Sequence, residues 1–399
     1  MKQNKFVRLM SPREDLQFKL TVAGGIFLII FVLGYILQSH PPRDQHGYLL
    51  GRDFVNYWMG ARAALAGRAQ SLLHIVSYNE ELIALFGPMP PHNWSYPPVM
   101  LLFLWPLGFL PYISALVLWS LAGLAVYLVA ARSTNRSGGF LAFVAVCPTV
   151  GICLFCGQNG FLTAALLIFV YRYWDERPWL AGIFLGCMLY KPHLVVLFPL
   201  ALALSGRWKA FISAAITVLA LGLLTAAVFG HDIWSEYLRL VTPVQHGVMT
   251  TGTGFLTMMP TGFMQARMMG YSIHVAWLVQ LPFTALAVIA VVWTFMKRRD
   301  PLLSYAVLIT ASFVVTPYAF DYDMVVFGWL LAMLWPCFFG KADRVLLILI
   351  WTLPVAMLIY GEHYLPVAAP LMALFLVRLL QKQNGGTISP AVAEGLPGI

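Results

Sequence analysis

The 399-residue sequence predicts an all-α integral membrane protein, a polytopic bundle of about twelve transmembrane helices. Two observations predict this fold class. Hydrophobic residues make up 60% of the chain and charged residues only 10%, whereas charged residues are about a quarter of an ordinary soluble domain. Apolar runs also recur from one end of the chain to the other, and several reach the roughly 20 residues with which a helix crosses the hydrocarbon core.

The first run, residues 20–37, is long for a signal peptide and has no clear small-residue cleavage site after it, so we expect a retained span. The fifth and sixth runs are short and meet at the sequence YKPHL. We expect one polytopic domain over residues 1–383 and a disordered, Gly/Pro-containing tail over 384–399. The expected spans are 20–37, 112–131, 139–156, 161–174, 179–190, 192–205, 209–229, 273–296, 302–316, 324–340, 345–360 and 365–377.

The placement of the basic residues predicts the orientation. With the N-terminus in the cytoplasm and these spans, 18 of the 25 basic residues fall on the cytoplasmic side, in agreement with the positive-inside rule. This topology requires residues 97–110, which contain Pro106, to dip into the outer leaflet and return. It places two long polar stretches, 38–96 and 230–272, on the outer face. Because the rule accounts for the net charge of +9, we expect no nucleic-acid partner.

Several function classes are disfavoured. The sequence has no P-loop and no G-x-G-x-x-G motif after a strand, which argues against a soluble nucleotide-binding domain. Its five cysteines lie within apolar runs, so no disulfide framework is expected. The middles of the apolar runs lack the ionisable side chains that ion-coupled transporters place at bilayer depth. We therefore expect the chemistry at the outer surface.

The polar stretch GRDFVNYWMGARAALAG follows the first span, and we expect its residues to form an interfacial helix. At about 100° per residue, Phe54 and Trp58 share one face, while Asp53, Asn56 and Gly60 share another. Glycine on the polar face would leave room for a small hydroxylated ligand beside the carboxylate. The alternative is that Asp53 only caps this helix.

Three later junctions on the outer face carry polar residues. In GQNG, Gln158 and Asn159 would hydrogen-bond a sugar or simply form a short loop. In YKPHL, Lys191 would bind the phosphate of a lipid substrate or snorkel to the headgroups. The sequence YPPV, which contains Tyr96, is explained by a structural turn alone.

The sequence Asp321-Tyr-Asp323 resembles the metal-binding DxD motif of nucleotide-sugar transferases. That motif works at the edge of a soluble α/β domain, which is not expected here, so we predict no metal site. The two acids would instead bind the acceptor, orient Lys191 or His193, or cap the helix that follows.

The stretches GRDFVNYWMGARAALAG, YPPV…PLGFLP, GQNGFLTAALL, LGCMLYKPHLVVLFPL and TPYAFDYD occur in this order and resemble the membrane glycosyltransferases of family 87. The similarity extends over residues 20–380. It implies the GT-C architecture, with outer-face interfacial helices in the first external loop. The transferred sugar would be a hexose, which is mannose in the bacterial α-1,2-mannosyltransferases. The donor would be a polyprenyl-phosphate sugar and the acceptor a lipid or glycan.

The resemblance also implies transfer at the periplasmic face of the bacterial inner membrane, among membrane lipids and without a cofactor. Related mannosyltransferases carry a histidine near the junction where this chain has Asp321-Tyr-Asp323. Because of this departure, the sugar and the acceptor of this chain do not follow directly from those of the related mannosyltransferases. The resemblance implies Asp53 as catalytic base. From the residues themselves we expect the donor phosphate to be bound by Lys191, Arg52 and Arg62, and the substrates to be bound by Asn56, Tyr57, Tyr96, Gln158, Asn159, His193, Asp321 and Asp323.

Physical reasoning from the residues agrees with this function. An inverting transfer needs a base for the acceptor hydroxyl and a cation for the charge that grows on the leaving phosphate. Two other function classes stay open from the sequence: a flippase or exporter of lipid-linked glycans, and a non-catalytic subunit of an envelope polysaccharide assembly.

Overall fold

The computed structural model describes residues 12–251, 256–297, 299–361 and 366–384, and within these ranges the protein is all-helical, with no β-strand. The prediction of an all-α fold is confirmed. The last described helix, α19 (Ala368–Asn384), overlaps the expected final span, 365–377, and extends beyond its end. The predicted disordered tail lies, apart from Asn384, outside the described residues.

Five helices of the described chain are long and apolar enough to cross a membrane: α1 (Pro12–Leu37), α5 (Tyr112–Thr134), α11 (Trp208–Phe229), α15 (Ile273–Phe295) and α18 (Lys341–Gly361). A sixth span results if α6 (Gly138–Ala145) and α7 (Pro148–Cys156), which meet at 47°, are counted together. In α1 only 6% of the apolar window is buried inside the protein. So exposed an apolar helix indicates a protein that is surrounded by lipid.

Shorter apolar helices fill the interior between these spans. They are α8 (Gly160–Tyr173), α9 (Pro178–Cys187), α10 (Phe198–Leu204), α16 (Pro301–Val315) and α17 (Val325–Leu334). Two 3-10 turns, Met188–Tyr190 and Pro192–Val195, separate α9 from α10 at the expected break in YKPHL. Because these helices are shorter than a full crossing, the count of about twelve spans stays a prediction.

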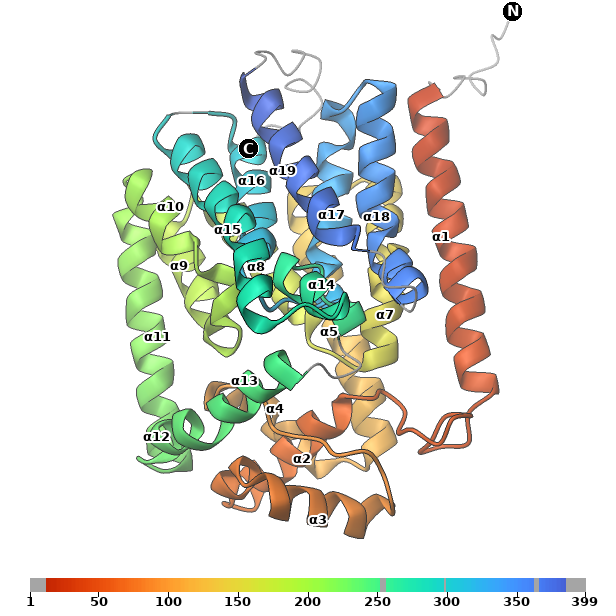
Figure 1. Cartoon of the computed structure of the whole chain (residues 1–399), viewed down its shortest axis with the longest axis vertical. Coiled ribbons are helices and arrows are strands. Elements are labelled where there is room, and N and C mark those ends of the chain that lie inside the picture. The colour runs from red at the N-terminus through yellow and green to blue at the C-terminus, as the bar shows by residue number, and fades with distance from the viewer. Residues whose placement is uncertain (1–11, 252–255, 298, 362–365, 385–399) are drawn as a thin grey trace, which may run out of the picture.

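The first long polar loop and the first part of the second form one layer at one end of the molecule (Figure 1). The first contributes α2 (Phe54–Leu65) and α3 (Ile75–Phe86), and the second contributes α12 (Ile233–Glu236) and α13 (Thr242–Thr251). The later part of the second loop, α14 (Gly262–Met268), lies nearer the middle of the molecule and packs against α15 (Figure 1). Between α12 and α13, Tyr237 donates a hydrogen bond of 3.2 Å to the carbonyl of Ser95 in the first loop. The layer lies at the end opposite the start of α1 and the end of α19 (Figure 1).

Helix α2 does not lie on the membrane surface, which corrects the expectation of an interfacial helix. Its residues from Phe54 to Ala61 are all buried. The space expected beside Gly60 is filled by the ring of Trp94, which would lie 2.4 Å from a Cβ at that position. By contrast, α3 leaves Ile75, Val76 and Ile83 exposed, as an interfacial helix would.

Residues Pro98–Phe109 form a short apolar helical segment that consists of η2 (Pro98–Met100), α4 (Leu101–Leu104) and η3 (Trp105–Phe109), with Pro106 near the start of η3. This segment packs along α2. A Cβ on Gly108 would lie 2.8 Å from the carbonyl oxygen of Ala61, so the two backbones are in close contact.

Candidate active site

Three turns from distant parts of the chain meet at Asp53. Gly157 has φ of +58°, and a Cβ there would lie 2.8 Å from the carbonyl oxygen of Gly51, just before α2. A Cβ on Gly160 would lie 2.0 Å from the carbonyl oxygen of Tyr322. Only glycine fits at either position. The turn GQNG is therefore wedged between the start of α2 and η8 (Asp321–Met324).

Asp53 occupies the N-cap position of α2, but its side chain makes no capping hydrogen bond. Its Oδ2 instead accepts a hydrogen bond of 2.8 Å from Nε2 of Gln158. The alternative in which Asp53 only caps the helix does not match this geometry. Burial raises the pKa of the Asp53 carboxyl, and the Gln158 hydrogen bond and nearby positive charges act in the opposite direction. A carboxylate with a raised pKa is a better proton acceptor.

Gln158 connects Asp53 to two tyrosines. Its Oε1 lies 2.5 Å from the hydroxyl of Tyr57 and 2.9 Å from that of Tyr96, and the two hydroxyls are 2.7 Å apart. Four of the predicted site residues thus form one hydrogen-bonded group. Gln158 is buried and both of its polar atoms are engaged within the protein, so the structure does not present it as a direct sugar ligand.

Lys191 and Asp323 form a buried ion pair with an Nζ–Oδ1 distance of 2.5 Å. Their side chains are 6% and 0% exposed, and the ammonium lies 5.0 Å from the centre of the Tyr322 ring. The lysine is therefore held inside the protein and does not snorkel to the headgroups. Of the uses expected for the two acids, orienting Lys191 is the one that this geometry matches for Asp323.

Several buried polar atoms next to this pair have no hydrogen-bond partner among the described residues. They are Nδ2 and Oδ1 of Asn159, Oδ2 of Asp321 and Oδ2 of Asp323. The other oxygen of Asp321 accepts a hydrogen bond of 2.7 Å from the backbone N–H of Tyr322. Burial raises the pKa of Asp321 well above its ordinary value. Buried polar groups without a protein partner are generally satisfied by water or by a polar ligand.

His193 and Arg52 lie at the edges of this region. The His193 ring contacts Tyr318 edge to face at 5.6 Å, and its Nε2 has no partner among the described residues. Arg52 adjoins Asp53, but its guanidinium forms an ion pair of 2.6 Å with Asp44. It is therefore engaged elsewhere, in contrast to its expected role at the donor phosphate.

Two predicted residues of α2 make their side-chain contacts outside the hydrogen-bonded group of Asp53, Gln158, Tyr57 and Tyr96. Asn56 accepts a hydrogen bond of 2.6 Å from the hydroxyl of Tyr78, which ties α2 to α3. Arg62 stacks at 4.7 Å over the ring of Trp58. Arg62 comes nine positions after Asp53, which corresponds to a rise of about 13 Å along the helix axis. Within the described residues, no side-chain hydrogen bond joins Asn56 or Arg62 to Asp53 or Gln158.

His92, which was not among the residues predicted for the site, acts electrostatically on Asp53. Its backbone N–H and C=O both bond the Asn79 side chain at 2.8 Å, which fixes this loop against α3. The available signal was the run His-Asn-Trp before YPPV. Interpreting that stretch as a turn accounted for the prolines but not for these side chains.

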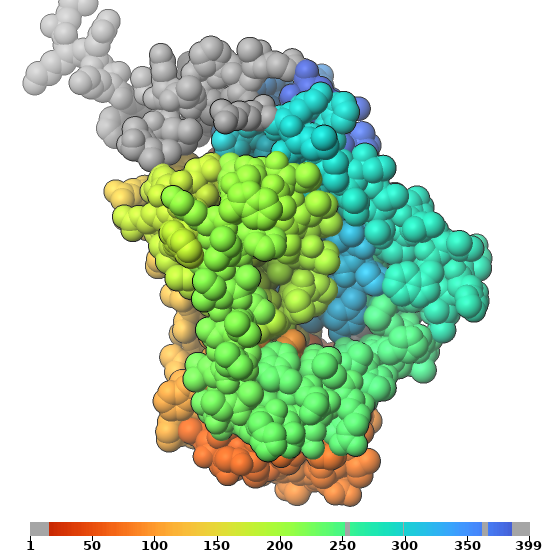
Figure 2. Space-filling model, turned by 90° about the vertical axis from the view of Figure 1, so that its left-hand side faces the viewer, coloured from red at the N-terminus to blue at the C-terminus, as the bar shows by residue number. Residues whose placement is uncertain are grey.

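The molecule is hollowed on the side that carries α9 to α13 (Figure 2). The hollow lies between α9 and α10 on one side and α12 and α13 on the other, and blue atoms of the last third of the chain are visible inside it. Two candidate membrane spans, α11 and α15, flank it.

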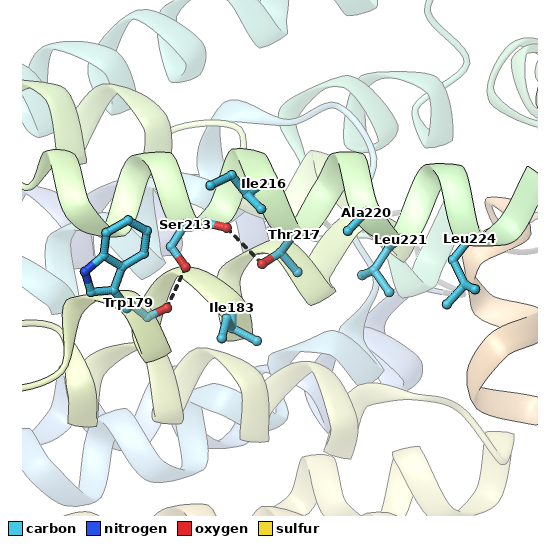
Figure 3. A pocket seen from close by; sticks show the side chains of 8 residues that line it. All are labelled: Trp179, Ile183, Ser213, Ile216, Thr217, Ala220, Leu221 and Leu224. Carbon is cyan, nitrogen blue, oxygen red and sulfur yellow. Dashed lines mark hydrogen bonds between the residues drawn. The ribbon is translucent and has the colours of Figure 1, made fainter.

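A second, apolar groove runs between α9 and α11 (Figure 3) and has a volume of about 430 Å³. Its hydroxyls are already bonded: Ser213 donates to the carbonyl of Trp179 at 2.6 Å, and Thr217 donates to that of Ser213 at 2.8 Å. A reaction site needs convergent free polar groups, which this groove lacks. Its lining residues are Trp179, Ile183, Ser213, Ile216, Thr217, Ala220, Leu221 and Leu224.

Comparison with known proteins adds one finding: the family model of glycosyltransferase family 87 matches residues 94–317, more than half of the chain. The chain belongs to glycosyltransferase family 87. No curated protein and no solved structure matches it. The predicted family and enzyme class are confirmed, and together with the apolar helices they make this protein a membrane glycosyltransferase.

The family match includes Gln158 and Lys191 but neither Asp53 nor the pair Asp321 and Asp323. The roles of these three carboxyls therefore rest on their positions in the structure. Among the described residues, no group of three or more His, Cys, Asp or Glu side chains could hold a metal ion.

Proposed function

We propose that this family 87 enzyme transfers a hexose, mannose, from a polyprenyl-phosphate donor to a lipid or glycan acceptor. The single observation that most supports the proposal is the placement of the Asp53 carboxylate. It is partly buried, accepts a hydrogen bond from Gln158 and interacts electrostatically with the Lys191 ammonium. Asp53 takes the proton of the acceptor hydroxyl, and Lys191 stabilises the charge that grows on the leaving phosphate.

The reaction takes place at the external face, which in a bacterium is the periplasmic side of the inner membrane. Nucleotide sugars are cytoplasmic, so a transferase on the outer side needs a sugar on a carrier that crosses the membrane. An isoprenoid phosphate is such a carrier. The hollow between α11 and α15 (Figure 2) supports lateral access for it, with the phosphate toward the outer layer and the chain in the bilayer.

The test uses the full-length protein in liposomes with radiolabelled polyprenyl-phosphate-mannose and a mixture of lipid and glycan acceptors. We expect a labelled glycosylated product. Parallel reactions with polyprenyl-phosphate-glucose examine the sugar separately from the carrier. Transbilayer movement of the donor without product would favour a flippase over this proposal.

Asp53→Asn tests the catalytic base. The amide keeps the size of the side chain, and no capping hydrogen bond is lost, so we expect a change in stability of at most about 1 kcal/mol. It cannot accept a proton, and loss of a general base typically slows a reaction by about 10²–10⁴-fold. Thermal unfolding and initial rates should therefore separate. Near-normal turnover of a stable variant would exclude Asp53 as the base.

A further inference from the structure

We propose that Gln158 is the positioning residue of Asp53, holding the carboxylate in one orientation and in its ionised form through an amide that Tyr57 and Tyr96 fix. The inference rests on the proposed role of Asp53 as catalytic base. It assigns Gln158 a role different from the sugar contact that the sequence suggested. Tyr57 and Tyr96 likewise act through Gln158 in this assignment.

The hydrogen-bond directions leave only one arrangement of the amide. An ionised carboxylate only accepts hydrogen bonds, so the atom of Gln158 that lies 2.8 Å from Asp53 Oδ2 must be the donating NH₂ group. The amide oxygen then faces the two tyrosine hydroxyls and accepts a hydrogen bond from them. Each hydroxyl has one proton, so one tyrosine donates to the other and the second donates to Gln158.

The result is a chain in which every donor points toward Asp53. Hydrogen bonds aligned in this way polarise one another, which strengthens the last bond to the carboxylate. The tyrosines are anchored by burial, with Tyr57 0% and Tyr96 9% exposed. Reversing the amide would place its oxygen against the carboxylate and its NH₂ group against hydroxyls that would have to reorient.

The backbone of Gln158 is fixed as firmly as its side chain. Its N–H donates to the carbonyl of Cys153 at 3.1 Å, and the Cys153 thiol donates to its C=O at 3.3 Å. Gly157 and Gly160 press the turn against α2 and η8. The amide therefore reaches Asp53 from a rigid support, which is what orienting a reactive carboxylate requires.

Other charges also act on Asp53. Arg52 comes from the same turn, His92 from the loop after α3, Lys191 from the junction of α9 and α10, and Asp321, with the opposite sign, from η8. Arg52 is paired with Asp44 and Lys191 with Asp323. Within the described residues, none of these four charged groups makes a hydrogen bond to the Asp53 carboxylate, whereas Gln158 does.

The direction of the effect follows from these contacts. Burial raises the pKa of Asp53, and the hydrogen bond from Gln158 lowers it. Removing this bond must raise the pKa further. A hydrogen bond to a charged group corresponds to a shift of about one pH unit or more. Because a general base works when ionised, the acid limb of the pH–rate profile would move to higher pH.

The test measures the protonation of Asp53 directly, without any substrate. Infrared spectra of the full-length protein in liposomes are recorded across a pH titration, and the carboxyl band absent from Asp53→Asn is assigned to Asp53. In Gln158→Leu we expect the midpoint of this band to rise by about one pH unit or more. Tyr78→Phe is the matched control, because it removes another buried tyrosine–amide hydrogen bond on α2. Its midpoint should equal that of the parent.

An unchanged midpoint in a folded Gln158→Leu protein would overturn the proposal. If that variant does not fold, the double variant Tyr57→Phe, Tyr96→Phe keeps Gln158 and removes what fixes its amide. It should also raise the midpoint, and an unchanged value there would again overturn the proposal. The outcome is separate from the proposed function, since an active Asp53→Asn would exclude the base while leaving the titration of Asp53 as found.

Discussion

At the scale of single residues, the Lys191–Asp323 pair gives a prediction that separates stability from catalysis. Lys191→Ala leaves Asp323, which is 0% exposed, without its ion-pair partner. Breaking a buried pair on one side typically costs about 3–5 kcal/mol. The loss of one charge-assisted contact to the donor phosphate should also reduce transition-state stabilisation by about 1–3 kcal/mol. Thermal unfolding and initial rates against donor concentration measure the two effects.

The double variant Lys191→Met, Asp323→Asn distinguishes them, because it removes both charges of the pair. We expect most of the stability to return while the use of the donor stays impaired. Lys209→Ala, which removes an exposed lysine at the start of α11, serves as the control for general loss of charge. Donor kinetics that return together with stability would reduce Lys191 to a structural role.

The residues of the candidate site could be predicted individually, but their contacts could not. Gln158 and Lys191 were identified because each is a polar residue at the end of an apolar run, and Asp53 because it is the carboxylate of the polar stretch that follows the first span. The hydrogen bond between Asp53 and Gln158 joins residues 105 positions apart, and no local pattern encodes such a pair. The hydrogen bond from Tyr78 to Asn56 could not be predicted for a related reason: helical periodicity gives the angle of a side chain but not the neighbour that it contacts.

At the scale of elements, the turn GQNG depends on glycine for its contact with η8. The Gly160 Cβ would lie 2.0 Å from a backbone oxygen, so Gly160→Ala must push the turn and η8 apart. Overpacking of this kind typically costs about 1–3 kcal/mol. Because Gln158 belongs to the same turn, we also expect a fall in turnover. Gly222→Ala in α11, where no atom lies within 4 Å of the added Cβ, is the matched control.

Thermal unfolding and sugar transfer of these two glycine variants are compared with the parent. The control should be as stable as the parent or more stable, because alanine favours helix by up to about 1 kcal/mol over glycine. Parent-like turnover and stability in Gly160→Ala would contradict the tight contact between GQNG and η8.

The helices themselves were well predicted where the apolar runs are long, because length and composition alone define a span. Runs with a proline inside were less predictable. Residues 139–156 form two helices that meet at 47°, and Pro148 starts the second. The burial of α2 could not be predicted either, because the Trp94 ring that covers Gly60 comes from a loop outside the helix.

At the scale of the whole molecule, the arrangement of the helices depends on the topology. Ser77 lies in α3, and Ser137 lies between α5 and α6, which the predicted topology places on the cytoplasmic side. Both residues are exposed. In the predicted topology α5 is the single crossing between them. If Pro98–Phe109 also crossed the membrane, the two serines would lie on the same side.

Cysteine labelling therefore tests the topology and the returning segment together. Of the native cysteines, Cys147, Cys153, Cys156 and Cys337 are buried, so Cys187→Ser gives a quiet background. We expect a membrane-impermeant maleimide to label Ser77→Cys but not Ser137→Cys in right-side-out vesicles, and the reverse in inside-out vesicles. Labelling of both from outside would mean that residues 97–110 cross the membrane. Labelling of Ser137→Cys alone from outside would mean that the whole orientation is the reverse of the predicted one. Asp53 would then face the cytoplasm, where nucleotide sugars are present and a lipid carrier that crosses the membrane is not needed.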